Sequence, residues 1–160
     1  MDRWPLPPII FKGLPPSSNN IRVISWKRKI QFLTKEAQNF RSRFLGDVVP
    51  NYAHIIRELD KEALYEVFYR FYFAKDSILN KTYGLGKKGS AKSRYKKMDA
   101  ENRIKFLSDC LSEAIGIDDS HFFAGGYRKM CAQPNQEEEV HIYIAPRDPI
   151  EFGVPSESRP

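Results

Sequence analysis

Apolar residues recur along this chain with a helical spacing in two segments. The first follows Thr34, a residue type that often caps helices, and its apolar positions are Ala37, Phe40, Phe44 and Val48. The second covers 101–115 and ends at Gly116, the residue type that most often terminates a helix. Its apolar side is formed by Ile104, Leu107, Leu111 and Ile115. Its polar side includes Asn102, Lys105 and Asp109.

Strand-like runs account for most of the remaining apolar residues. The run 63–74 is rich in aromatic residues that partly alternate, so we expect a central strand whose rings pack in the core rather than stack on bases. Three further runs predict strands: 8–14, 121–132 and 139–145. We expect a bulge at Gly125-Gly126 and a hairpin loop at 133–138 between the last two strands. Residues 21–33 fit either a strand or a loop.

The order of these elements predicts a single α+β domain, in which a small mixed sheet packs against two main helices. We expect the domain to cover 1–146, with a loop inserted at about 77–97 and a loose tail at 147–160. No run of about 18 apolar residues and no signal-peptide pattern are present, so we expect a cytoplasmic protein without a membrane span. Neither the two cysteines nor the three histidines form a zinc-binding pattern.

The charge of the chain suggests that the inserted loop binds a partner. A net charge of +6 favours a polyanionic partner, and the basic residues are concentrated between Lys75 and Lys105. This stretch also contains Gly84, Gly86 and Gly89, which is typical of an exposed and mobile loop. It leads directly into the acidic residues at the start of the second helix.

Acidic residues lie at both ends of that helix. Asp99 and Glu101 stand at its start, Lys105 follows one turn later, and Asp118-Asp119 come just after its end. Carboxylates that hold Mg²⁺ and a cation that stabilises charge on a phosphate are what phosphodiester cleavage requires. Taken singly, these residues also fit caps, partners of the helix dipole and turn residues. Because the helix ends are about 20 Å apart, Asp119 joins the site only if the chain turns back.

The spacing of these residues resembles the signature of the RusA family of Holliday junction resolvases. The matching pattern is Asp99-x-Glu101-Asn102-x-x-Lys105-x-x-x-Asp109-x-Leu111, followed by Gly116-Ile117-Asp118-Asp119. The segment Pro15-Pro16-Ser17-Ser18-Asn19-Asn20 is similar to the N-terminal segment of the family, and Val140 to Ile144 fits its last strand. The resemblance spans roughly residues 9 to 145. The chain departs from the pattern at Glu101, where the family usually has Asp.

The resemblance implies a homodimeric endonuclease that cuts four-way DNA junctions by paired symmetric nicks in recombination and repair. It implies Mg²⁺, with Mn²⁺ as a substitute, bound by Asp99, Glu101 and Asp119 with Asp118 beside them. Lys105 would contact the phosphate that is cut. Three asparagines would support the site or contact DNA: Asn19, Asn20 and Asn102. The family distribution implies a bacterial or phage-infected cell.

The basic loop fits phosphate contacts that carry no sequence information. The expected contact residues are Lys87, Lys88, Lys92, Arg94, Lys96 and Lys97. An insertion without a role is the alternative for this loop. For the whole chain, the alternatives are a non-catalytic nucleic-acid-binding module and a related nuclease that cuts flaps or other branched DNA.

Overall fold

A four-stranded mixed sheet forms the centre of the protein. The computed structural model describes residues 3–17, 20–97 and 100–155, and only the backbone of Asn102. The strands lie in the order β1-β6-β4-β5. Their bounds are β1 Ile9–Lys12, β4 Leu64–Phe73, β5 Phe122–Cys131 and β6 Glu139–Arg147. β6 is antiparallel to both β1 and β4, whereas β5 is parallel to β4.

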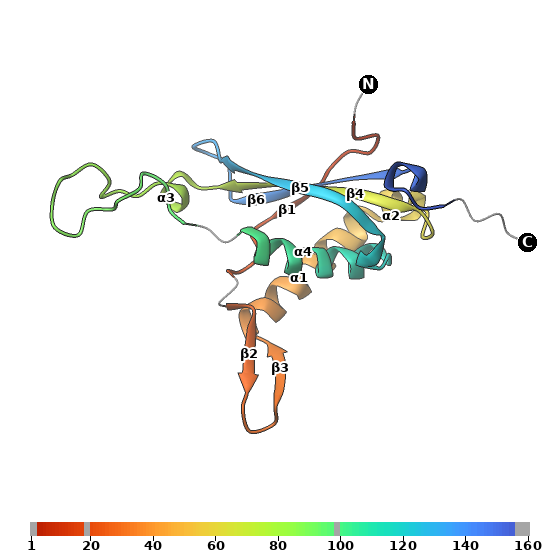
Figure 1. Cartoon of the computed structure of the whole chain (residues 1–160), viewed down its shortest axis with the longest axis horizontal. Coiled ribbons are helices and arrows are strands. Elements are labelled where there is room, and N and C mark those ends of the chain that lie inside the picture. Colours follow the sequence, from red (N-terminus) through yellow and green to blue (C-terminus); the bar gives the residue numbers. More distant parts are fainter. Residues whose placement is uncertain (1–2, 18–19, 98–99, 156–160) are drawn as a thin grey trace, which may run out of the picture.

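Two main helices cover one face of this sheet, α1 (Lys35–Asn51) and α4 (Ala100–Ile115) (Figure 1). The Ala37 amide donates to Thr34 Oγ1 (3.1 Å), so Thr34 is the N-cap of α1 as predicted. The four apolar positions expected for this helix are all buried. Two shorter helices follow α1 and β4 respectively, α2 (Ala53–Glu58) and α3 (Lys75–Ile78). The structure confirms the single α+β domain with a mixed sheet and two main helices.

The aromatic strand β4 supplies much of the core. Its inward-facing residues are all buried: Tyr65, Val67, Tyr69, Phe71 and Phe73. These rings pack against the apolar sides of α1 and α4, which confirms that they serve packing rather than base stacking. On the opposite face, Glu66 is only 7% exposed, and its carboxylate is paired with Arg147 and Arg3. Trp4 covers that same face, in contact with the rings of Phe68 and Tyr143.

Two expectations about β5 are wrong. β5 and β6 do not form a hairpin, because both pair with β4, on its opposite sides. The bulge lies at Phe123 rather than at Gly125-Gly126, since Tyr65 pairs with Phe122 and Glu66 with Ala124. Gly125 is needed for another reason: a Cβ there would lie 2.1 Å from the Val67 carbonyl oxygen. Periodicity indicates that a segment is a strand but does not identify its partner.

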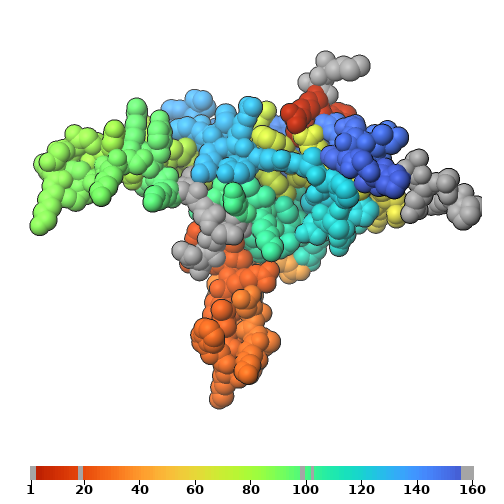
Figure 2. Space-filling view, in the orientation of Figure 1, coloured from red at the N-terminus to blue at the C-terminus, as the bar shows by residue number. Residues whose placement is uncertain are grey.

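The remaining segments project from or flank this body. Residues 21–33, left open between strand and loop, form a hairpin of β2 (Arg22–Ser25) and β3 (Ile30–Leu33) that extends away from the sheet (Figure 1). The basic loop forms a second projection, closed at its base by a bridge between Leu79 and Tyr95 (Figure 2). Where a loose tail was expected, β6 continues through Pro146 and the 3-10 helix η3 (Pro149–Phe152) follows. Across the described ranges, no helix is both long and apolar enough to cross a membrane.

Candidate functional site

The exposed side of α4 carries the polar residues that the sequence singles out. Lys105 and Asp109 lie one turn apart on this side, while Leu107 and Leu111 are buried against the core. Glu101 is exposed in the first turn of the helix. It lies eight residues before Asp109, about 12 Å away along the helix axis. The helix therefore separates Glu101 from the residues near its middle.

The chain turns back immediately after α4. Gly116 has a φ of 68°, the left-handed conformation that a glycine at this position adopts most easily. The Ile117 amide donates to the Ser112 carbonyl (3.2 Å), and the Ser112 hydroxyl donates to the Ile117 carbonyl (2.6 Å). These contacts fold the segment after the helix against its last turns and bring the 3-10 helix η2 (Asp119–His121) beside α4.

Asp118 and Asp119 have different environments in this turn. The Asp118 carboxylate accepts a hydrogen bond from the Ser120 amide (2.9 Å) and is the N-cap of η2. Hydrogen bonds from Ser120 lower the pKa of Asp118. One oxygen of Asp118 is thus already used by the local backbone, whereas Asp119 follows as an exposed carboxylate at the start of η2.

Asp119 lies within electrostatic reach of Asp109. Burial raises the pKa of Asp109, and the negative charge of Asp119 raises it further, while the charges of Arg22 and Lys105 lower it. We call these four residues the Asp109–Asp119 cluster. In the described part of the chain, neither carboxylate of the cluster forms an ion pair. One carboxylate and two cations therefore act electrostatically on Asp109.

A partly buried pair of hydroxyls lies next to Asp109 on α4. The hydroxyls of Tyr69 and Ser108 share a hydrogen bond of 2.7 Å, which ties α4 to the centre of β4. Burial raises the pKa of Tyr69, and the charges of Asp109 and Asp119 add to this rise. Tyr69 is thus a neutral anchor for the helix rather than a proton donor or acceptor near neutral pH.

The predicted metal ligands are only partly placed by the structure. Asp99 lies outside the described residues. The structure therefore describes only three of the four predicted ligands: Glu101, Asp118 and Asp119. Within 3–17, 20–97 and 100–155, no group of three or more Asp, Glu, His or Cys side chains lies close enough to hold a metal ion. The carboxylate on which Asp119 acts electrostatically is Asp109, which the sequence did not assign to the metal site. Its signal in the sequence was its position on the polar side of the helix, one turn after Lys105.

The predicted DNA-contacting residues fall into two groups. Asn20, Lys96 and Lys97 line one hollow of about 540 Å³ beside the start of α4, together with Pro15, Pro16 and Ser17. Arg103 of α4 also lines it and donates to the Pro15 carbonyl (2.7 Å). The segment at 15–20 and the end of the basic loop therefore line the same hollow.

The second group lies on the projecting basic loop and is exposed: Lys87, Lys88, Lys92 and Arg94. Arg94 lies next to the Leu79–Tyr95 bridge at the base of the loop, whereas Lys87 begins a turn in which the Ser90 amide donates to its carbonyl (2.9 Å). The rest of the loop extends away from the body of the protein (Figure 1). Asn19 lies outside the described residues, and the side chain of Asn102 is not described either. The structure therefore brings Lys96 and Lys97, at the C-terminal end of the basic loop, together with Asn20. It does not bring the residues in the middle of the loop to this hollow.

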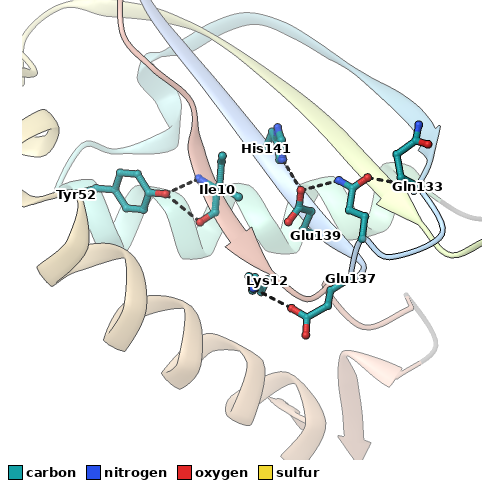
Figure 3. A network of polar contacts seen from close by, with 8 residues as sticks. Ile10, Lys12, Tyr52, Gln133, Glu137, Glu139 and His141 are labelled. Atoms are coloured by element: carbon teal, nitrogen blue, oxygen red, sulfur yellow. Dashed lines mark hydrogen bonds and ion pairs between the residues drawn. The ribbon is translucent and has the colours of Figure 1, made fainter.

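Another polar cluster, between β1 and β6, stabilises the fold (Figure 3). Glu139 is bound by Gln136 Nε2 and His141 Nε2, each at 2.7 Å, and Lys12 pairs with Glu137 at 3.1 Å. Burial favours the neutral form of Glu139, but the bonds from His141 and Gln136 outweigh it and lower the pKa of Glu139. Because each of these carboxylates already has a partner, we do not count them in the functional site.

Comparisons with known protein families and with curated proteins give no match for this chain.

Proposed function

We propose that the protein is a Mg²⁺-dependent endonuclease that cuts branched DNA, above all four-way junctions, as the RusA family does. One observation carries the proposal: the turn after α4 brings Asp119 within electrostatic reach of Asp109, one helical turn from Lys105. Two carboxylates beside a lysine are suited to holding a divalent cation and a phosphate at the same place.

The chemistry of the two carboxylates fits Mg²⁺. This ion is commonly held by one or two carboxylates together with substrate phosphates, and it keeps several waters. The pKa of Asp109 is raised by burial and by Asp119, so a cation bound between the two would relieve their repulsion. Asp109 and Asp119 would hold the ion. Asp99 and Glu101 are the ligands that the resemblance adds, but Glu101 lies about 12 Å from Asp109 along the helix axis and would not reach the same ion. When bound, Mg²⁺ supplies positive charge to the phosphate that is cut.

Individual residues of the chain would then have separate roles in cleavage. Lys105, exposed one turn before Asp109, would donate to a phosphate oxygen and stabilise the charge that develops there. Tyr69 and Ser108 would fix the height of α4 above the sheet through their hydrogen bond. The carboxylate of Asp118 would keep η2 in place by capping it, and η2 in turn positions Asp119.

The basic residues would bind the DNA arms. Lys96, Lys97 and Arg103 line the hollow beside the start of α4, where they would bind a phosphate next to the carboxylates of Glu36 and Glu138. The projecting loop would reach a more distant part of the same arm. We also propose a homodimer in the bacterial or phage-infected cytoplasm, because a two-fold symmetric junction is best cut by two sites related by a two-fold axis.

A nicking assay on synthetic DNA tests this function. The full chain is incubated with a four-way junction, a 5′ flap and a linear duplex of the same arm sequence, in Mg²⁺, Mn²⁺ or EDTA. We expect metal-dependent nicks at symmetric positions of two opposite strands of the junction, and little cleavage of the duplex. Binding without cleavage in either metal would indicate a non-catalytic binding module. Faster cleavage of the flap would indicate the related class of nuclease.

A further inference from the structure

The β2–β3 hairpin presents apolar side chains to solvent far from the core. Val23 and Phe32 are paired across its strands and are each 46% exposed, and Ile30 lies on the same face at 49%. Trp26, in the loop that joins the strands, is 83% exposed. The outer part of the hairpin stands clear of the sheet and both main helices in the space-filling view (Figure 2). Exposed apolar groups this concentrated usually mark a binding surface.

The charge of the hairpin identifies the kind of partner. Its loop continues from Trp26 into Lys27, Arg28 and Lys29, and Arg22 begins its first strand. No acidic residue occurs between positions 20 and 35. Two copies of the chain that met through this hairpin would bring like charges together, which is unfavourable. An anionic partner that also offers flat apolar groups matches both features of the surface.

The base of the hairpin lies against the Asp109–Asp119 cluster. Arg22 and Phe32 line a cavity of about 220 Å³ with Asp109 and Cys110 of α4. The charge of Arg22 also acts on Asp109. A partner held by the hairpin would therefore extend along it toward the carboxylates of the proposed site.

We propose that the β2–β3 hairpin engages the branch point of the DNA, where Trp26 stacks on an unstacked base and Lys27, Arg28 and Lys29 bind the neighbouring phosphates. The inference rests on the proposed function, because it takes branched DNA as the substrate. Bases in a continuous duplex cover each other's faces, whereas a branch point exposes them to an aromatic side chain. The hairpin thereby selects branched over linear DNA, and its base places the branch beside Asp109.

Equilibrium binding without catalysis tests this role. The affinities of the wild type and Trp26→Ala for a four-way junction and for a linear duplex are measured in EDTA. We expect Trp26→Ala to weaken junction binding about tenfold and duplex binding by less than about twofold. Trp26→Phe should recover most of the loss, since it keeps an aromatic face. Ile150→Ala is the matched control, because Ile150 is an exposed apolar residue of η3 outside both proposed surfaces.

Fluorescence gives a second measurement on the same surface. The chain has two tryptophans, so Trp4→Phe leaves Trp26 as the only one, and a ring at position 4 still covers Phe68 and Tyr143. We expect the junction to quench Trp26 emission strongly and the duplex to quench it weakly.

Each other outcome overturns the inference. The hairpin would not recognise the branch point if Trp26→Ala left the junction affinity unchanged. The same conclusion would follow if the affinities for junction and duplex fell equally. A Trp26-dependent monomer–dimer equilibrium would assign the surface to a second copy, and Trp26-dependent binding to anionic vesicles would assign it to lipid. If the wild type still nicks junctions in Mg²⁺, only this inference fails. If it neither binds nor nicks them, the proposed function fails as well.

Discussion

Asp109 and Asp119 lie close enough for the negative charge of Asp119 to raise the pKa of Asp109, which burial has already raised. The end of α4 and a left-handed glycine turn separate the two residues along the chain. Their proximity shows how a helix that turns back at Gly116 can bring a carboxylate to the middle of its own polar side. Lys105 also acts on Asp109 and lowers its pKa, so a cation and a second carboxylate have opposite effects on the same side chain.

Lys105→Ala should slow junction nicking by about a hundredfold or more, because it removes a positioned cation from the phosphate. Junction affinity should change much less, since many other cations bind the arms. The pKa of Asp109 should rise, because Lys105 lowers it in the wild type. Single-turnover nicking rates and a carboxyl-carbon NMR titration measure the two effects. Arg57→Ala, at an exposed basic residue of α2, is the control, and near wild-type nicking by Lys105→Ala would refute the assigned role.

Replacing Lys87, Lys88, Lys92 and Arg94 together by glutamine should weaken binding to every DNA arm sequence equally. Each lost phosphate contact should reduce the slope of log affinity against log salt by about 0.9. These side chains are exposed, so the free energy of unfolding should not change. Binding titrations at several salt concentrations measure the slope, and an unchanged slope would make the loop an insertion without a role in DNA binding.

Glu66→Gln should lower the free energy of unfolding by about 2 kcal/mol at neutral pH, because it leaves Arg147 without its buried partner. Burial alone would raise the pKa of Glu66, but hydrogen bonds from Arg147 and Arg3 outweigh it and lower the pKa. The ionised carboxylate therefore stabilises the fold fully above the unfolded-chain pKa of about 4.3, and this contribution is lost as the pH falls through the folded-state value. Urea unfolding between pH 3 and pH 7 should show the two proteins converging in acid. A constant difference would contradict this pairing.

Gly125→Ala should lower the free energy of unfolding by more than about 3 kcal/mol, since its Cβ would collide with the Val67 carbonyl oxygen of β4. Gly46→Ala is the matched control, because no atom lies within 4 Å of a Cβ added there. Gly46 is inside α1, where alanine should stabilise the helix by about 1 kcal/mol. Thermal and urea unfolding of both variants measure the contrast, and equal stabilities would mean that β4 and β5 do not approach this closely.

Much of the fold follows from the sequence, because its helices have one clear apolar side and a clear start or end. Thr34 and Gly116 mark those limits, and the buried positions of α1 are those that the spacing predicts. Strand pairing does not follow in the same way. An alternating strand such as β5 can pair on either side of β4 or with β6, and side-chain periodicity carries no information on that choice. Several apolar residues of the hairpin at 21–33 are exposed, although apolar residues are usually buried, so their pattern does not predict a projecting hairpin.

The candidate site is predicted less completely than the fold. The spacing along α4 correctly places Lys105 and Asp109 on a common polar side, because helical geometry fixes it. The distance from Asp119 to that side depends on the turn after Gly116, which is a tertiary feature. The sequence also does not distinguish the two adjacent aspartates, although Asp118 caps η2 and Asp119 acts electrostatically on Asp109.

Junction nicking by Asp119→Asn is the most direct test of the central claim, that the Asp109–Asp119 cluster cuts DNA with a bound divalent cation. The substitution removes one negative charge and one potential metal ligand while keeping the size of the side chain. Wild type, Asp119→Asn and the control Asp47→Asn are compared on the same four-way junction in Mg²⁺. Asp47 is a half-buried carboxylate on α1 that accepts a hydrogen bond from Asn51 (2.9 Å) and lies outside both proposed surfaces. We predict that Asp119→Asn nicks at least about a hundredfold more slowly and binds the junction as well as the wild type or better. Wild-type nicking by Asp119→Asn would contradict the account.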